Sequence, residues 1–93
     1  MSFLWNPLKA AANVQLHGVT FEEAESIFRD PLAVTVEDQI HSELEPREII
    51  IGHSDKGRLL FVCFTERAEG IRLISAREAT RTERKNYEDN HDF

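Results

Sequence analysis

Cysteine is almost absent from this sequence of 93 residues, which contains only Cys63. One thiol cannot form an internal disulfide framework, and it cannot supply the thiolates of a structural zinc site. Cys63 lies inside the apolar run 59–64, so we expect a buried core thiol and not a reactive nucleophile. The four histidines are not spaced as a metal-binding motif. The sequence therefore predicts no metal and no other cofactor.

Long apolar runs are missing as well. The longest ones fall far short of the ~20 residues that a membrane-spanning helix requires. The opening segment MSFLWNPLK lacks the charged region and long apolar stretch of a secretion signal. We therefore expect a cytoplasmic protein with no membrane partner. A chain of this length has room for one hydrophobic core, which predicts a single domain over residues 1–93.

Positive charge is scarce in the first half of the chain. The net charge is −6, and residues 1–45 contain only Lys9 and Arg29 as basic residues, against eight acidic ones. The other nine basic residues all lie between residues 47 and 85. This separation is compatible with a surface that binds a polyanion, and also with ordinary ion pairing between exposed side chains.

Local signals predict a helix near the N-terminus, directly after a short strand over residues 3–5. Asn6 followed by Pro7 is typical of a helix start, because the asparagine can cap and the proline fits the first helical position. The helix should run to about Leu16, and Gly18 suits the left-handed residue that ends it.

A second helix is predicted to follow at once. Residues 20–23, TFEE, have the pattern of a capping box, in which the side chains of Thr20 and Glu23 bond to each other's backbone amides. The pair Asp30-Pro31 should end this helix, because the residue before a proline avoids the helical conformation.

The remainder of the chain predicts four strands and a final helix. The strands are expected over residues 32–37, 48–53, 58–65 and 71–75, and the helix over residues 77–89. The most apolar strand, 58–65, should lie at the centre of the sheet. Short connections favour antiparallel hairpins, with the helices on one face and the other face partly open. The expected fold class is α+β, in the order β-α-α-β-β-β-β-α.

Arginine residues are the first candidates for a functional site. Five arginines lie in or beside the predicted final helix: Arg67, Arg72, Arg77, Arg81 and Arg84. The last three are spaced i, i+4, i+7, which would place them on one helical stripe. Guanidinium groups bind phosphate in a bidentate fork. The alternative is that Glu78 and Glu83 neutralise these arginines.

Acid–base groups supply the second candidate. His17 lies at the end of the first helix and could serve as a general acid or base, although a lone histidine is often structural. Glu45 and Arg47 flank a proline and form either a salt-bridged edge or a catalytic pair, with Glu43 as a rival carboxylate. RNA cleavage without a metal needs such groups and cations for the phosphate. The residues alone leave open an enzyme acting on phosphodiesters and a binding module for protein or nucleic acid.

A set of separated motifs, in order along nearly the whole chain, indicates a protein family more specifically than any single residue does. The motifs are residues 3–9, Asn13, residues 17–24, Asp30-Pro31, Glu45 with Arg47, Ile51-Gly52, residues 62–67, residues 71–79, and Glu83-Arg84 with Tyr87. Together they resemble the BrnT family, the toxins of BrnT–BrnA type II toxin–antitoxin systems. The resemblance departs at Asn6, where the family usually has aspartate, and at Leu16, where it usually has lysine.

The resemblance implies a fold and a partner. The fold would be RelE-like, with N-terminal helices packed on an antiparallel sheet and a C-terminal helix. The activity would be cleavage of RNA that inhibits translation. A BrnA-type ribbon-helix-helix antitoxin would neutralise the toxin, and operator DNA would be contacted only through the antitoxin complex. The alternative is a catalytically weak or inactive binding module that acts in complex assembly and operon regulation.

The resemblance also implies a site. The expected catalytic residues are His17, Glu45, Arg47, Arg67 and Arg77. The expected RNA-binding residues are Lys9, Arg81 and Tyr87. In this hypothesis Arg77 lies near Arg67 and the arginines hold the scissile phosphate, while His17 or Glu45 moves the proton.

Overall fold

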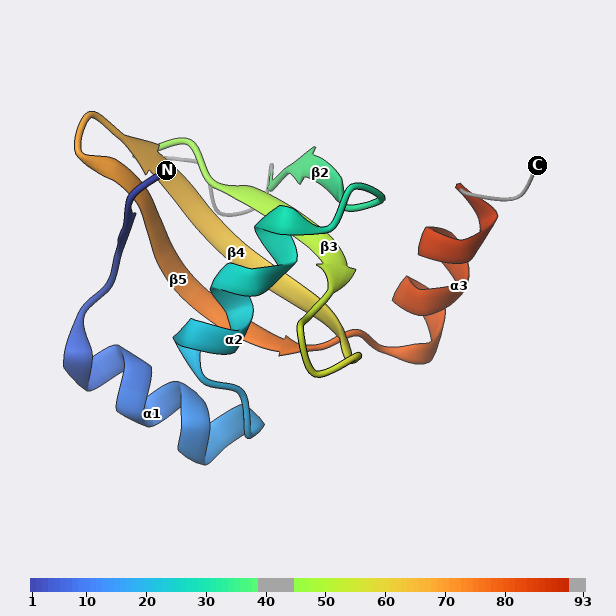
Figure 1. The fold of residues 1–93 in the computed structure, drawn as a ribbon, viewed down its shortest axis with the longest axis horizontal. Helices are drawn as coiled ribbons and strands as arrows, with labels where there is room; N and C mark the ends of the chain where they lie inside the picture. The colour runs from blue at the N-terminus through green and yellow to red at the C-terminus, as the bar shows by residue number, and fades with distance from the viewer. Residues whose placement is uncertain (39–44, 91–93) are drawn as a thin grey trace.

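A computed structural model describes residues 1–38 and 45–90 of the chain, and in these ranges it has an α+β fold (Figure 1). The predicted order β-α-α-β-β-β-β-α is confirmed. The elements are β1 (Phe3–Leu4), α1 (Pro7–His17), α2 (Phe21–Ser26) with the 3₁₀ turn η1 (Ile27–Arg29), β2 (Val34–Glu37), β3 (Glu48–His53), β4 (Leu59–Arg67), β5 (Gly70–Glu78) and α3 (Arg81–Asp89). No helix of these two ranges is long and apolar enough to cross a membrane.

The five strands form one sheet in the order β1-β5-β4-β3-β2. Strands β2 to β5 are an antiparallel meander, and β4 lies at the centre, as predicted. Strand β1 pairs with β5 in parallel, so the expectation of a purely antiparallel sheet is wrong. After α1 and α2 the chain enters the sheet at β2, on the edge opposite β1, and β5 reaches β1 only after the meander has crossed the sheet.

The hydrophobic core lies between one face of the sheet and the helices. The side chains of Leu60, Val62 and Phe64 alternate along β4 toward this face and are almost completely buried. They pack with Phe21 and Ile27 from the helical segment that crosses in front of the sheet in Figure 1. Burial of these side chains holds α2 and η1 against the sheet.

The opposite face of the sheet, called the open face below, is more accessible. It carries the side chains of alternate residues, among them Ile49, Ile51 and Phe61, and these are only partly buried. Val36, next to Ile49 in the register, is 48% exposed. The expectation of a partly open face is therefore confirmed for the described residues.

The two ends of α1 follow the predicted local signals. The Oδ1 atom of Asn6 accepts hydrogen bonds from the backbone amides of Leu8 (2.8 Å) and Lys9 (3.3 Å). Gly18 ends the helix in the left-handed conformation, with φ of 67°. A residue with a Cβ would be strained at this φ, which explains the glycine.

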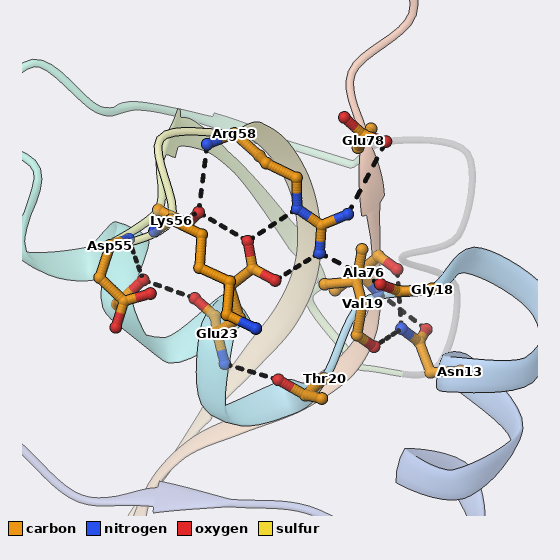
Figure 2. A network of polar contacts seen from close by, with 12 residues as sticks. Asn13, Gly18, Val19, Thr20, Glu23, Asp55, Lys56, Arg58, Ala76 and Glu78 are labelled. Carbon is orange, nitrogen blue, oxygen red and sulfur yellow. Dashed lines mark hydrogen bonds and ion pairs between the residues drawn. The ribbon is translucent and has the colours of Figure 1, made fainter.

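Asn13 fixes α1 to the sheet. It is the only buried residue of this helix. Its Nδ2 donates to the carbonyls of Ala76 (2.8 Å) and Val19 (2.9 Å), and its Oδ1 accepts from the amide of Ala76 (3.0 Å). Strand β1 pairs with only two residues of β5, Ile71 and Arg72. Farther along the same edge, the Asn13 side chain makes the hydrogen bonds to Ala76 that a neighbouring strand would otherwise make (Figure 2).

The C-terminal part of the chain differs from the prediction. Strand β5 extends to Glu78, so Arg77 belongs to a strand and the helix expected from residue 77 starts only at Arg81. A capping box formed by Thr80 and Glu83 sets this start. The expected helical stripe of three arginines is therefore wrong. Helix α3 stands beyond the end of β5, apart from α1 (Figure 1).

Candidate functional site

The open face of the sheet gathers arginine side chains from three strand segments. The register pairs Phe61 with Arg77 and Thr65 with Arg72, and both partners on β4 point to the open face. A bulge in the β4–β5 register between Cys63 and Phe64 makes this possible, since Arg72 and Arg77 would otherwise point to opposite faces.

Two further arginines follow from the alternation of side chains along the strands. Arg67 lies two residues after Thr65, and Arg47 lies two residues before Ile49, so both belong to the open face. Arg47 also acts electrostatically on the thiol of Cys63, a residue of the same face. The open face therefore carries four arginines: Arg47, Arg67, Arg72 and Arg77.

Arg67 and Arg77 do not lie close together. Arg67 pairs with Gly70 at one end of the β4–β5 hairpin, whereas Arg77 pairs with Phe61 near the other end. Six residues lie between Gly70 and Arg77, one of them the extra residue of the bulge, and the matching six steps along β4 correspond to roughly 20 Å at about 3.3 Å per residue. The expectation that both arginines grip one phosphate is wrong, because β5 runs in the opposite direction to β4.

At the first end of the open face, Arg67 forms an ion pair with Glu45. Its Nη2 atom lies 2.9 Å from Oε2 of Glu45, and both side chains are 39% exposed. The hydroxyl of Thr65 donates to the carbonyl of Pro46 (2.7 Å), which holds the segment before β3 against β4. Glu45 is thus paired with Arg67, a residue distant in sequence. The rival carboxylate Glu43 lies outside the described residues.

At the second end, Arg77 is held by two interactions. Its guanidinium lies over the ring of Phe61, 4.1 Å from the centroid. Its Nη1 and Nη2 atoms donate to the two carboxylate oxygens of Glu83, at 2.7 and 2.9 Å. This charge-assisted pair raises the pKa of Arg77 and lowers the pKa of Glu83. Neutralisation by Glu83, the alternative considered from the sequence, is therefore present.

Next to this end, Tyr87 of α3 meets two residues from other elements. Its hydroxyl lies 3.5 Å from Oδ2 of Asp30 and 3.5 Å from Nδ1 of His53. Asp30 also accepts from the backbone amides of His53 (2.7 Å) and Leu32 (2.9 Å). Burial opposes ionisation of Asp30, but these hydrogen bonds lower its pKa. Burial and the charge of Asp30 raise the pKa of Tyr87.

An open pocket of about 290 Å³ adjoins this cluster. Its lining residues are Ser26, Arg29, Asp30, His53, Ser54 and Asp55. His53 and Asp30 were not predicted from the sequence as site residues. The pair Asp30-Pro31 was interpreted as a helix end and as one of the BrnT-like motifs but not as part of the site, and no local pattern connects residue 30 with residues 53 and 87.

Lys9 and His17 lie away from the open face. Both are exposed side chains of α1, the helix that packs against β5 and places Ala10 on the core. The carbonyl of Gly18, next to His17, accepts from Nη2 of Arg58 (3.1 Å). Arg81, at the first position of α3, is exposed.

A buried carboxylate connects the helices with the β3–β4 turn. The Glu23 side chain accepts from both Nε and Nη2 of Arg58 and from the hydroxyl of Ser54 (2.6 Å) (Figure 2). The hydrogen bond from Arg58 lowers the pKa of Glu23 and outweighs burial. Only half of the predicted capping box exists, because Thr20 accepts from the Glu23 amide (3.0 Å) while the carboxylate points inward.

Cys63 is buried, as predicted, and burial raises the pKa of its thiol. A thiol in this state is a poor nucleophile. Among the residues that the structure describes, no group of three histidine, cysteine, aspartate or glutamate side chains could hold a metal ion.

Comparisons with known proteins identify the family. A family model described as the ribonuclease toxin BrnT of type II toxin–antitoxin systems matches residues 5–83. The chain belongs to the BrnT family. A 1.1 Å crystal structure of the Brucella abortus ribonuclease toxin BrnT has the same fold, with a TM-score of 0.68. The two sequences are 21% identical, and the match covers 87% of this chain and 99% of that one. A search of curated proteins gave no significant match.

The BrnT family match includes both ends of the open face. Residues 5–83 contain Arg47, Arg67, Arg77 and Glu83, and they exclude Tyr87. For a BrnT-family toxin, a face with four arginines is chemically suited to the phosphates of an RNA strand. Of the predicted catalytic residues, Glu45, Arg47 and Arg67 lie toward one end of this face and Arg77 lies at the other, while His17 on α1 lies away from it.

Proposed function

We propose that this chain is a toxin that cleaves RNA on the open face of its sheet and thereby inhibits translation. The observation that carries the proposal is the presence of four arginines on one accessible face of a BrnT-family fold. Guanidinium groups supply the paired donors that phosphate oxygens accept. In this proposal Arg77 binds the scissile phosphate and stabilises its additional charge during the reaction.

The middle of the open face suits the bases of a single strand. Ile49 lies between the two ends, and Ile51 lies beside Phe61, whose ring Arg77 covers; Ile49 and Ile51 are partly exposed and apolar. Bases of single-stranded nucleic acid stack on aromatic and apolar side chains, while cations follow the backbone. An RNA strand that runs from Arg67 to Arg77 would place its bases on these residues.

The cleavage requires no metal in this proposal. The 2′-hydroxyl of the substrate is the nucleophile, so the protein has to accept one proton, assist the leaving oxygen and stabilise the phosphate. Carboxylate, imidazole and guanidinium groups are sufficient for these roles. Cleavage should therefore continue in the presence of excess EDTA.

A protein antitoxin of the BrnA ribbon-helix-helix type is the proposed partner. A type II toxin is neutralised by a protein, and an acidic segment laid over the four arginines would block the RNA site directly. Operator DNA would be contacted by the antitoxin within the complex, because the chain itself has a net charge of −6.

Expression in a bacterial host without an antitoxin tests the proposal. The wild-type chain should arrest growth and degrade RNA, and Arg77→Ala should relieve the arrest while circular dichroism shows a retained fold. Arg84→Ala, which removes an exposed arginine of α3, is the matched control and should remain toxic. Growth arrest with intact RNA would instead support a non-catalytic binding module.

A further inference from the structure

The Asp30, Tyr87 and His53 side chains can form a chain of hydrogen bonds. The carboxylate of Asp30 accepts two backbone amides and acts here as an acceptor. In this chain the Tyr87 hydroxyl donates its single proton to Asp30, and its oxygen accepts from Nδ1–H of His53, each at 3.5 Å.

This direction of donation determines the tautomer of His53. A neutral imidazole carries one proton, and with that proton on Nδ1 the Nε2 atom has a free lone pair. The His53 side chain is 46% exposed, and it borders the pocket of about 290 Å³ described above. The cluster therefore presents a proton acceptor to solvent at the end of β3.

Helix α3 contacts both this acceptor and Arg77. Glu83, which binds Arg77, and Tyr87, which contacts His53, are four residues apart on the same helix. Residues with this spacing lie on one side of a helix, with Cβ atoms about 5–6 Å apart. His53 and Arg77 also point to the same face of the sheet, since Ile51, two residues before His53, pairs with Phe61.

We propose that His53 is the general base of RNA cleavage, with Tyr87 and Asp30 as the residues that position it. The inference rests on the proposed function. The 2′-oxygen forms a bond to phosphorus and its proton passes to Nε2 of His53. The bond from phosphorus to the 5′-oxygen breaks, the departing oxygen takes a proton from water, and a 2′,3′-cyclic phosphate remains. Arg77 stabilises the phosphate throughout.

The charged surroundings of His53 comprise groups from several elements. Asp30 lies 3.8 Å from Nδ1 at the end of η1, and Tyr87 faces the ring edge-on from α3. Arg29 and Asp55 line the adjoining pocket. Asp30 and Asp55 are acidic and Arg29 is basic, so the groups around His53 carry charges of both signs.

The test uses the purified full chain and a single-stranded RNA oligonucleotide labelled at both ends, with kcat and KM measured as functions of pH. His53→Gln should lower kcat by about 100-fold or more, the usual contribution of a general base, with little change in KM. His53→Ala should regain part of its activity when free imidazole is added. Tyr87→Phe should shift the acid limb of the pH profile, whereas the surface variant Glu88→Gln should not.

Three results would overturn the inference. A His53→Gln variant with wild-type kcat and pH profile would show that another residue takes the proton, and the proposed ribonuclease function would stand. A loss of activity in His53→Ala without rescue by imidazole would indicate only a structural role. If the wild-type chain cleaved no RNA at all, the proposed function itself would fail together with this inference.

Discussion

Arg77 is the residue on which the account of binding depends most. Its guanidinium is fixed over Phe61, and both of its terminal nitrogens are occupied by Glu83. A phosphate that approaches Arg77 must therefore compete with a carboxylate already in place. For phosphate binding, Glu83 is therefore a competitor within the same chain.

Removal of the Glu83 charge should strengthen RNA binding. Glu83→Gln keeps an oxygen that can accept from the Thr80 amide, so the start of α3 should be retained. We expect the dissociation constant for an RNA that lacks the reactive 2′-hydroxyl to fall about fivefold, or roughly 1 kcal/mol. Fluorescence anisotropy measures this change. An equal gain in the control Glu88→Gln would indicate a general charge effect and contradict the specific competition.

Glu23 should make stability depend on pH. The folded state lowers its pKa below the ordinary value of 4.5, so the ionised carboxylate stabilises the fold above that pH. This contribution is lost as the pH falls through the folded-state pKa. Glu23→Gln should lower the free energy of unfolding by about 2 kcal/mol at pH 7, and the difference should shrink in acid.

Urea unfolding at several pH values measures this difference. The exposed neighbour Glu22 offers a matched control, because Glu22→Gln removes the same charge from the same helix turn. A difference between Glu23→Gln and wild type that stayed constant from pH 7 to strongly acidic pH would contradict the assignment.

Local sequence signals predicted the helices and strands correctly wherever neighbouring residues determine where an element begins and ends. The cap of α1 by Asn6, its end at Gly18 and the bounds of β3 all follow from such signals. The start of α3 had a signal too, since Thr80 and Glu83 form the pattern of a capping box, but the helical spacing of the arginines led to a start at residue 77.

Long-range pairing could not be predicted in the same way. The parallel pairing of the two-residue strand β1 with β5 has no local signature. The bulge that brings Arg72 and Arg77 to one face appears only in the β4–β5 register. The residues of the open face were largely named in advance, but their separation into two ends, and the cluster of Asp30, His53 and Tyr87, depend on tertiary contacts.

Asn13 should be essential for the attachment of α1 to the sheet. Asn13→Ala would leave the amide and carbonyl of Ala76 without their side-chain partners in a buried place. We expect a loss of about 3 kcal/mol in the free energy of unfolding. Gln15→Ala, an exposed change on the same helix, should be nearly neutral. Urea denaturation that gave equal stabilities for both variants would show that the edge contact contributes little.

The whole molecule combines a net negative charge with a basic face. Acidic residues dominate the first 45 positions, which form both N-terminal helices, whereas the arginines of the open face all come later. A charge of −6 would repel RNA from most of the surface. In the proposed function, the charges on the two sides of the sheet therefore favour one orientation, in which RNA meets the open face and the two N-terminal helices face away from it.

Direct cleavage of RNA by the purified chain tests the proposed function most directly. Wild-type protein and the Arg77→Ala variant are incubated in EDTA with single-stranded RNA, and the products are separated on a denaturing gel. We predict fragments that end in 2′,3′-cyclic phosphate with the wild type, and at least a tenfold lower rate with the folded variant. RNA that stays intact with the wild type, or equal rates for both proteins, would contradict the claim.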